Sequence, residues 1–232
     1  VQDLVSFLNI SESTVRRDLL TLDREGRLRR VHGGATTLRD DSLYEADMEN
    51  LQDKYSIHMS EKRRIAQYAA RLIHKEDFVY LDAGSTTEQL VEFLAGSEAT
   101  FVTNSIPLAQ KLGRIGGRVY IVPGRVKGDT EAIVGSEMRD MIGRYHFTKG
   151  FFGANGIAVH SGCTTPDDEE AVCKRAALGQ CLDRFVLADS SKFGLSSHIT
   201  FAELSMVTLI TARDDDSLDY KPYQQITEVH IL

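Results

Sequence analysis

The segment from Phe78 to Leu94, FVYLDAGSTTEQLVEFL, constrains the fold more than any other part of the sequence. It begins with four apolar residues, 78–81, which are typical of a buried parallel strand. Leu90 and Leu94 then recur at helical spacing. Between these two parts, the sequence DAGSTT predicts a glycine turn followed by the start of a helix. A strand, a turn and a helix in this order predict one repeating unit of an α/β domain.

The same turn is a candidate anion site. The first N–H groups of a helix have no acceptor within the helix, and the aligned peptide dipoles favour a phosphate there. The hydroxyls of Ser85, Thr86 and Thr87 add further donors. The alternative is that Ser85 or Thr86 only caps the helix. The turn by itself therefore does not establish a ligand.

Charge is distributed unevenly along the chain. The 232 residues include 27 basic and 34 acidic ones, for a formal net charge of −7. Residues 1–38 contain six arginines and five acidic residues, a net of +1, which leaves 21 basic and 29 acidic residues, or −8, for the remainder. We therefore expect only the N-terminal segment to face a polyanion such as DNA.

The cysteines and the hydropathy predict a protein of the cytoplasm. Cys163, Cys173 and Cys181 are odd in number and form no C-x-x-C pair, so we expect reduced thiols. The sequence has no apolar run of membrane-spanning length and no signal segment at its start. We expect no membrane partner, no metal and no cofactor.

The first 38 residues predict a helix-turn-helix followed by a β-wing. Apolar residues at 1, 4, 5 and 8 lie on one face of a short helix. A second helix, capped by Ser11 or Ser13, directs apolar residues inward and arginines outward. In the sequence RLRRVHGGAT at 27–36, basic and apolar residues then alternate as in a strand, and two glycines allow a turn. The alternative is a surface helix with a solvated basic face. The candidate DNA contacts are Ser11, Ser13, Thr14, Arg16 and Arg17 of the helix and Arg29 and Arg30 of the wing.

These residues resemble a known family. SESTVRRDL at 11–19, followed by Leu22, Gly26 and RRVHGGA at 29–35, is similar to the winged helix-turn-helix of the DeoR family of bacterial sugar-metabolism regulators. In that family a further helix precedes the motif. The sequence begins at Val1 without it, so we expect a DNA-binding domain over 1–38 that is truncated by about one helix.

The remainder of the chain predicts a linker and a larger α/β domain. Residues 39–58 are polar and acidic, as linkers are, and 60–74 form an amphipathic helix with Lys62, Arg63 and Arg64 exposed. Beyond it, strands are expected at 78–81, 100–103, 119–122, 150–153, 185–189, 206–210 and 229–232, and helices at 105–112, 136–142 and 169–181. This alternation predicts an α/β effector domain over 59–232 with a mostly parallel sheet.

Polar residues follow several of the predicted strands. In a parallel sheet these ends meet at one edge, where ligands bind. A lone Asn or Lys there is more often a turn former or a surface charge, but several together suit a phosphorylated polyol. We expect Ser85–Thr87 and Lys192 to hold a phosphate, and Asp82, Asn104 and Asn155 to hold hydroxyls.

The effector domain also resembles the DeoR family, through DAGSTT, VTNS, FFGANG, TTPDDEEAVCKRAA and LADSSKFG. That domain is akin to ribose-5-phosphate isomerase, whose members use a helix-borne Glu and a pair of acids in a D-G-A-D-E loop. Glu170 is similar to the retained Glu, but the loop reads GANG at 153–156 and lacks a carboxylate. The resemblance therefore implies binding without catalysis. The candidate effector residues are Asp82, Gly84, Ser85, Thr86, Thr87, Asn104, Gly153, Asn155, Gly156, Glu170, Lys174 and Lys192.

Two functions follow. The first is a DNA-binding repressor of a sugar-utilisation operon, controlled by a phosphorylated sugar in the C-terminal domain. The alternative is an isomerase-like enzyme with an accessory N-terminal domain. The arginines of the second helix and the missing acid pair favour the first. We expect operator DNA and a sugar phosphate as partners, and a homodimer or tetramer, because two-fold operators are read by two-fold proteins.

Overall fold

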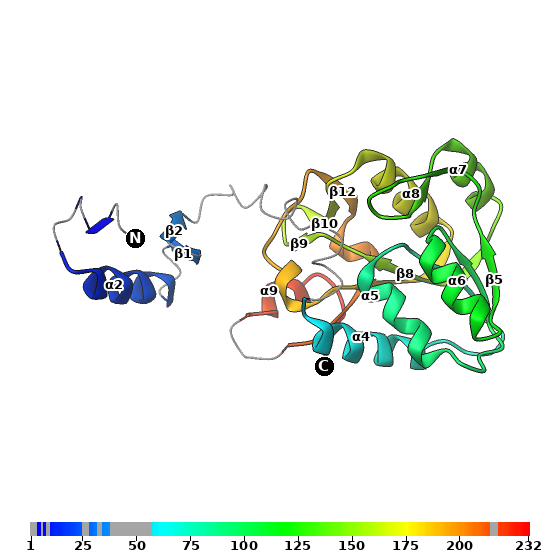
Figure 1. Ribbon diagram of the computed structural model, residues 1–232, viewed down its shortest axis with the longest axis horizontal. Coiled ribbons are helices and arrows are strands. Elements are labelled where there is room, and N and C mark those ends of the chain that lie inside the picture. Colours follow the sequence, from blue (N-terminus) through cyan, green and yellow to red (C-terminus); the bar gives the residue numbers. More distant parts are fainter. Residues whose placement is uncertain are drawn as a thin grey trace. The chain divides into compact units, whose positions relative to one another are not determined.

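The computed structural model describes residues 4–5, 7, 10–24, 28–31, 34–37, 57–213 and 218–232 (Figure 1). The chain divides into two compact units, Val1–Ser42 and Leu43–Leu232. The expected linker, 39–58, lies outside the described residues except for 57 and 58. The predicted fold class is confirmed in its coarse form: a small N-terminal unit that contains a helix, and a larger α/β unit with a parallel sheet.

The N-terminal unit contains a helix and a hairpin. Helix α2 (Glu12–Arg24) is followed by strands β1 (Leu28–Val31) and β2 (Gly34–Thr37), which pair antiparallel. The hydroxyl of Ser11 accepts the N–H of Thr14 at 3.2 Å and so caps α2, as predicted. Only residues 4, 5 and 7 of the expected first helix are described, and they are helical.

The larger unit is built on a seven-stranded sheet in the order β14-β13-β11-β8-β3-β4-β5. All six neighbouring pairs are parallel. The strands are β3 (Phe78–Leu81), β4 (Thr100–Thr103), β5 (Arg118–Ile121), β8 (Phe147–Gly153), β11 (Cys181–Leu187), β13 (Thr208–Thr211) and β14 (Val229–Ile231). Each of the seven predicted strands is present, with ends shifted by a few residues.

Helices cover both faces of this sheet (Figure 1). The helices are α4 (Met59–Arg71), α5 (Ser85–Glu88), α6 (Ile106–Arg114), α7 (Ser136–Ile142), α8 (Asp168–Gly179) and α9 (Lys221–Gln224), with 3-10 turns at Gln89–Phe93, Ser190–Lys192 and Leu204–Met206. Alternation along β3 divides the core: Val79 and Leu81 pack with α4 and α6, and Tyr80 packs with α7 and α8. Burial on both faces explains why β3 has an uninterrupted apolar sequence.

Two short antiparallel sheets escaped sequence analysis. One contains β9 (Gly156–Ala158), β10 (Gly162–Thr165) and β12 (Ile199–Ala202). The other pairs β6 (Arg125–Val126) with β7 (Ile133–Val134). These strands have two to four residues, which is too few to show a periodicity of two, and they lack the continuous apolar sequence that identified β3.

Several expected details are wrong. Residues 85–93 form one turn of α-helix and then a 3-10 helix, rather than a continuous amphipathic helix. Helix α8 ends at Gly179, and Cys181 already pairs with Phe147 as the first residue of β11. Lys62, expected on the exposed face of α4, is 3% exposed, because the loop that contains Asp189 covers it.

The three cysteines are free and buried. Burial raises the pKa of Cys163 and of Cys181 to about 12, so their thiols stay protonated at neutral pH. Among the described residues, no helix combines the length and the apolar character that crossing a membrane requires.

Asp77 ties together the beginnings of β3 and β8. Its carboxylate accepts hydrogen bonds from the Lys149 ammonium at 2.7 and 2.8 Å, from the Thr148 hydroxyl at 2.8 Å and from the His74 N–H at 2.7 Å. Burial acts to raise the pKa of Asp77, but these hydrogen bonds outweigh burial and hold the pKa below its usual value.

We predict that Asp77→Asn lowers the free energy of unfolding by about 1–3 kcal/mol at pH 7. Since the folded-state pKa is depressed, this contribution is present above the unfolded pKa of about 3.9 and is lost as pH falls through the folded value. Urea unfolding measured from pH 7 downward through the unfolded pKa of about 3.9 follows the loss of this difference. The neighbouring, exposed Glu76 provides the control Glu76→Gln, and equal losses for both variants would contradict the assignment.

Candidate functional site

The sheet has a switch point between β3 and β8. From β3 the chain adds β4 and β5 on one side, and from β8 it adds β11, β13 and β14 on the other. The crossovers therefore leave in opposite directions and open a crevice beyond the carboxyl ends of β3 and β8, where open α/β sheets bind ligands. The segment 82–87 and the segment 153–156 follow these two strands directly.

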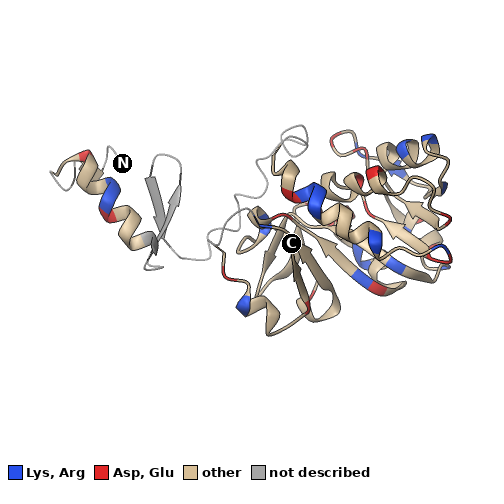
Figure 2. Ribbon diagram, turned by 90° about the horizontal axis from the view of Figure 1, so that it is seen from below, with Lys and Arg blue, Asp and Glu red and all other residues tan. Residues whose placement is uncertain are grey.

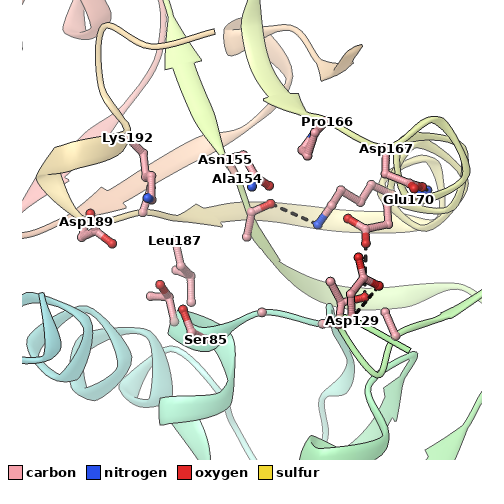
Figure 3. Close-up of a pocket in the computed structure, with 18 of the residues that line it drawn as sticks. Ser85, Asp129, Ala154, Asn155, Pro166, Asp167, Glu170, Leu187, Asp189 and Lys192 are labelled. Atoms are coloured by element: carbon pink, nitrogen blue, oxygen red, sulfur yellow. Dashed lines mark hydrogen bonds between the residues drawn. The ribbon is translucent and has the colours of Figure 1, made fainter. Parts of the chain in front are cut away.

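A cavity of about 290 Å³ lies at this position (Figure 3). Its volume is at the small end of the range for ligand pockets, roughly 300–1,000 Å³. Its polar lining comes from the β3 turn, the β6–β7 hairpin, the loop after β8, the start of α8 and the loop after β11.

Eight of the twelve predicted effector residues line this cavity: Gly84, Ser85, Thr86, Gly153, Asn155, Glu170, Lys174 and Lys192. The other four, Asp82, Thr87, Asn104 and Gly156, are not in its lining. For these four, the structure shows a supporting position, which corrects the expectation that they contact a ligand directly.

Asp82 is 1% exposed and faces inward. Its Oδ2 atom accepts the Gly153 N–H at 3.1 Å and forms an ion pair with Lys174 Nζ. Lys174 also donates to the Gly153 carbonyl at 3.2 Å. Burial raises the pKa of Asp82 above its usual value, and the Lys174 ammonium opposes that rise. Asp82 therefore joins the ends of β3 and β8 to α8 and does not present an acceptor to the cavity.

Thr87 and Asn104 shape the turn after β3. The Thr87 hydroxyl donates to the carbonyls of Asp82 at 2.7 Å and Gly84 at 2.8 Å. Asn104 Oδ1 accepts the Ala83 N–H at 2.9 Å. Both side chains are at most 3% exposed. They hold the backbone that presents Ser85.

Of the two glycines at these strand ends, Gly84 and Gly156, only Gly156 is required by the space around it. Gly84 has φ 165°, which is extended backbone, and a Cβ there would make ordinary contact with Thr87 Oγ1 at 3.4 Å. At Gly156 a Cβ would lie 2.6 Å from the Leu195 carbonyl oxygen, so only glycine allows this approach. The expected glycine turn at 84 is thus not a left-handed one.

An ion-paired cluster occupies one end of the cavity. Lys127 Nζ lies 2.7 Å from Asp167 Oδ2 and 2.9 Å from Glu170 Oε1. Burial acts to lower the pKa of Lys127, but the hydrogen bonds to Asp167 and Glu170 outweigh it and raise that pKa. Burial acts to raise the pKa of Asp167, and the Lys127 hydrogen bond together with the Glu170 N–H outweighs it and lowers that pKa. Lys127 and Asp167 are therefore charged at neutral pH.

At the other end Ser85, Asp189 and Lys192 face the cavity (Figure 3). Lys62 also lines this end, and its Nζ lies 4.0 Å from Asp189 Oδ2. Behind them, Glu61 is 2% exposed and accepts the Ser190 N–H at 2.7 Å and its hydroxyl at 2.9 Å.

A three-residue group beside this end has donor types that metals use. Ligand atoms of His58, Glu61 and Asp189 lie within 4.8 Å of one another. Glu61 already accepts two hydrogen bonds from Ser190, and Asp189 accepts the Ser191 N–H at 3.2 Å. Because these lone pairs are engaged, we assign no metal to the group.

Several lining residues were not predicted from the sequence, among them Lys62, Lys127, Asp129, Thr130, Asp167 and Asp189. The signal at Asp189 was present, since it is the last residue of a strand predicted at 185–189. For Lys127, Asp129 and Thr130, the signal was the sequence GRVKGDT at 124–130, with two glycines, which contains β6 and the start of the loop to β7.

Helix α2 presents most of the predicted DNA contacts at its surface. Ser11, Ser13, Arg16 and Arg17 are exposed and Thr14 is partly buried, whereas Val15 and Leu19 are buried. Figure 2 shows that the helix has charges of both signs, and Arg16 Nη2 lies 2.6 Å from Glu12 Oε1. Arg29 and Arg30 lie in β1, and their side chains are outside the described residues.

Both units match known protein families. Residues 57–213 match the family described as DeoR C terminal sensor domain, and residues 1–40 match the DeoR-like helix-turn-helix domain. The chain is 40% identical over 233 residues to the uncharacterized HTH-type transcriptional regulator FruR of Bacillus subtilis (strain 168), covering all of this chain and 91% of that protein. It is 34% identical over 223 residues to the lactose phosphotransferase system repressor of Streptococcus mutans, covering 94% and 87%.

Among solved structures, ribose 5-phosphate isomerase A of Methanocaldococcus jannaschii is similar with a TM-score of 0.43 and 14% identity, over 57% of this chain and 53% of that one. The eIF2B beta subunit of Chaetomium thermophilum has a TM-score of 0.48 and 18% identity, over 66% and 48%.

We predict that Lys174→Met destabilises the protein by about 3–5 kcal/mol, because it leaves the Asp82 carboxylate buried without its cation. In the double variant Asp82→Asn, Lys174→Met the loss should be smaller than in Lys174→Met alone, since no buried charge remains. Urea unfolding followed by circular dichroism measures both. A double variant whose loss equals the sum of the two single losses would show that the pair is not coupled.

Proposed function

The chain belongs to the DeoR family of transcriptional regulators, and on that premise we propose that it represses a sugar-utilisation operon under the control of a phosphorylated sugar bound at the switch-point cavity. The observation that carries this proposal is the position of the cavity within the span that matches a sensor domain. The names of the relatives support it, since several are repressors of the lactose phosphotransferase system.

The phosphate is assigned to the end of the cavity formed by Ser85, Thr86 and Lys192. The first N–H groups of α5 and the two hydroxyls are donors, and the Lys192 ammonium supplies a charge. Helix α5 has only four residues, so these local donors count for more than a helix dipole. Asn155 then serves as a partner for a sugar hydroxyl.

Operator recognition is assigned to the exposed N-terminal half of α2, with the wing beside it. Ser11 has a second role as the cap of α2, so we assign it to positioning rather than to base reading. The Arg16–Glu12 pair is exposed, and such pairs contribute only about 0.3–0.5 kcal/mol. A DNA phosphate or a guanine edge can therefore replace Glu12 as the partner of Arg16 at little cost.

Oligomerisation and location follow from this proposal. A two-fold operator requires two copies of the helix-turn-helix, so we propose a homodimer or tetramer held together by the 57–232 unit. Light scattering that finds only monomers would contradict this, if it is measured at the micromolar concentrations at which such proteins bind DNA non-specifically.

A protein that binds operator DNA works in the cytoplasm, where we place it.

The enzyme alternative is disfavoured by the state of Glu170, the residue that resembles the helix-borne Glu of the isomerases. Glu170 accepts from Lys127 at 2.9 Å and from the hydroxyls of Thr130 and Thr165 at 3.3 Å, so its oxygens are engaged. A general base must be within reach of the proton that it removes and ready to accept it. We propose that the protein does not turn over its ligand, and ribulose 5-phosphate formed from ribose 5-phosphate in an NMR assay would contradict this.

We predict that Arg16→Ala and Arg17→Ala each weaken operator binding. Loss of an arginine that reads a base costs about 1–3 kcal/mol of binding free energy and relaxes sequence specificity. Loss of a phosphate contact instead weakens binding to all sequences and lowers the slope of log K against log salt concentration by about one unit. Fluorescence anisotropy at several salt concentrations with full-length protein distinguishes the two. Arg63→Ala, an exposed arginine on α4, is the control. The assignment is wrong if the double variant binds the operator like the wild type.

We predict that Lys192→Ala weakens sugar-phosphate binding about tenfold to a hundredfold, since one charge-assisted hydrogen bond contributes about 1.5–3 kcal/mol. Ser85→Asp should abolish binding, because its carboxylate would occupy the phosphate position. Ser136 starts α7 after Gly135 as Ser85 starts α5 after Gly84, which makes Ser136→Asp a matched control. Calorimetry with both Ser85→Asp and Lys192→Ala at wild-type affinity would place the ligand elsewhere.

A further inference from the structure

The two ends of the cavity carry opposite charge (Figure 3). We define the phosphate end by Ser85, Lys62, Lys192 and Asp189, where two ammonium groups face one carboxylate. We define the acid end by the four residues Lys127, Asp129, Asp167 and Glu170, where one ammonium group faces three carboxylates. With these side chains charged, the phosphate end has a net charge of +1 and the acid end has −2.

The lysine between these ends does not alter this difference. Lys174 lines the cavity, but the residue is only 5% exposed, and its ammonium is paired with Asp82 and donates to the Gly153 carbonyl at 3.2 Å. A ligand that took Lys174 would have to leave Asp82 as a buried, uncompensated carboxylate, which is strongly unfavourable.

The single lysine of the acid end is committed in the same way. Lys127 binds Asp167 at 2.7 Å and Glu170 at 2.9 Å, and its side chain is 12% exposed. The start of α8 is used as well, because Asp167 Oδ1 accepts the Glu170 N–H at 2.9 Å. An anion at this end would therefore meet three carboxylates without a cation to receive it.

Neutral hydroxyl groups suit the acid end. Asp129 is exposed on the hairpin loop beside Thr130, so its carboxylate can accept hydrogen bonds from such hydroxyls. Asp167 and Glu170, whose oxygens already accept hydrogen bonds, act on a ligand through their charge. The cavity of about 290 Å³ has room for only one small ligand that spans both ends.

We infer that the site selects a sugar monophosphate, with its phosphate at the phosphate end and a neutral polyol tail at the acid end, and that Asp129, Asp167 and Glu170 exclude bisphosphates of the same sugar. This inference rests on the proposed function and adds the ligand's orientation and the residues that set its specificity.

The test compares ligands that share a carbon skeleton. Calorimetry on the full chain would use fructose 1-phosphate, fructose 6-phosphate and fructose 1,6-bisphosphate, with glucose 6-phosphate and inorganic phosphate as further probes. For the wild type we expect at least one monophosphate to bind tenfold or more tightly than the bisphosphate. In the double variant Asp129→Asn, Glu170→Gln the ratio of the monophosphate affinity to the bisphosphate affinity should fall at least fivefold, because the bisphosphate binds more tightly.

Glu169→Gln provides the matched control, because Glu169 is an exposed acid of α8 that pairs with Arg125 and does not line the cavity. Its ratio should equal that of the wild type. A wild type that binds the bisphosphate within threefold of the best monophosphate overturns this inference and leaves the proposed function standing. A ratio unchanged in the double variant also overturns it. If none of the sugar phosphates binds, the proposed function fails as well.

Discussion

The effector unit depends on a buried ion pair between Asp82 and Lys174. The pair lies where the sheet reverses its winding, and it joins the end of β3, the end of β8 and the middle of α8 through Gly153. Water is excluded there, so each charge requires the other. Because the pair is satisfied internally, the cavity beside it can present other groups to a ligand while its floor keeps a fixed shape.

The residues that line the cavity belong to two kinds of element, the large sheet and the β6–β7 hairpin. Ser85 and Lys192 belong to turns that follow β3 and β11, so strands of the rigid sheet position them. Lys127 instead belongs to the β6–β7 hairpin and reaches Asp167 and Glu170 at the start of α8. A ligand that spans both ends therefore touches the sheet and the hairpin together. This is a physical route by which occupancy could bias the position of the hairpin.

Sequence patterns predicted the sheet better than the site. The strand at 78–81 is recognisable in the sequence by four consecutive apolar residues, because both of its faces are buried. The inward position of Asp82 could not be predicted, because it depends on Lys174, which is 92 residues away. The exposed face assigned to Lys62 failed for a similar reason: helical periodicity records the neighbours within α4, but not the loop after β11 that covers it. The short hairpin strands left no period to detect.

The central claim is that a sugar phosphate binds at the switch point between β3 and β8. Hydrogen exchange followed by mass spectrometry, with and without the sugar phosphate that calorimetry identifies, tests it most directly because it requires no substitution. We predict slower exchange in the backbone of 83–88, 127–131, 153–156 and 189–193, with unchanged exchange at the beginnings of the strands near Asp77. Protection confined to segments outside these four would contradict it.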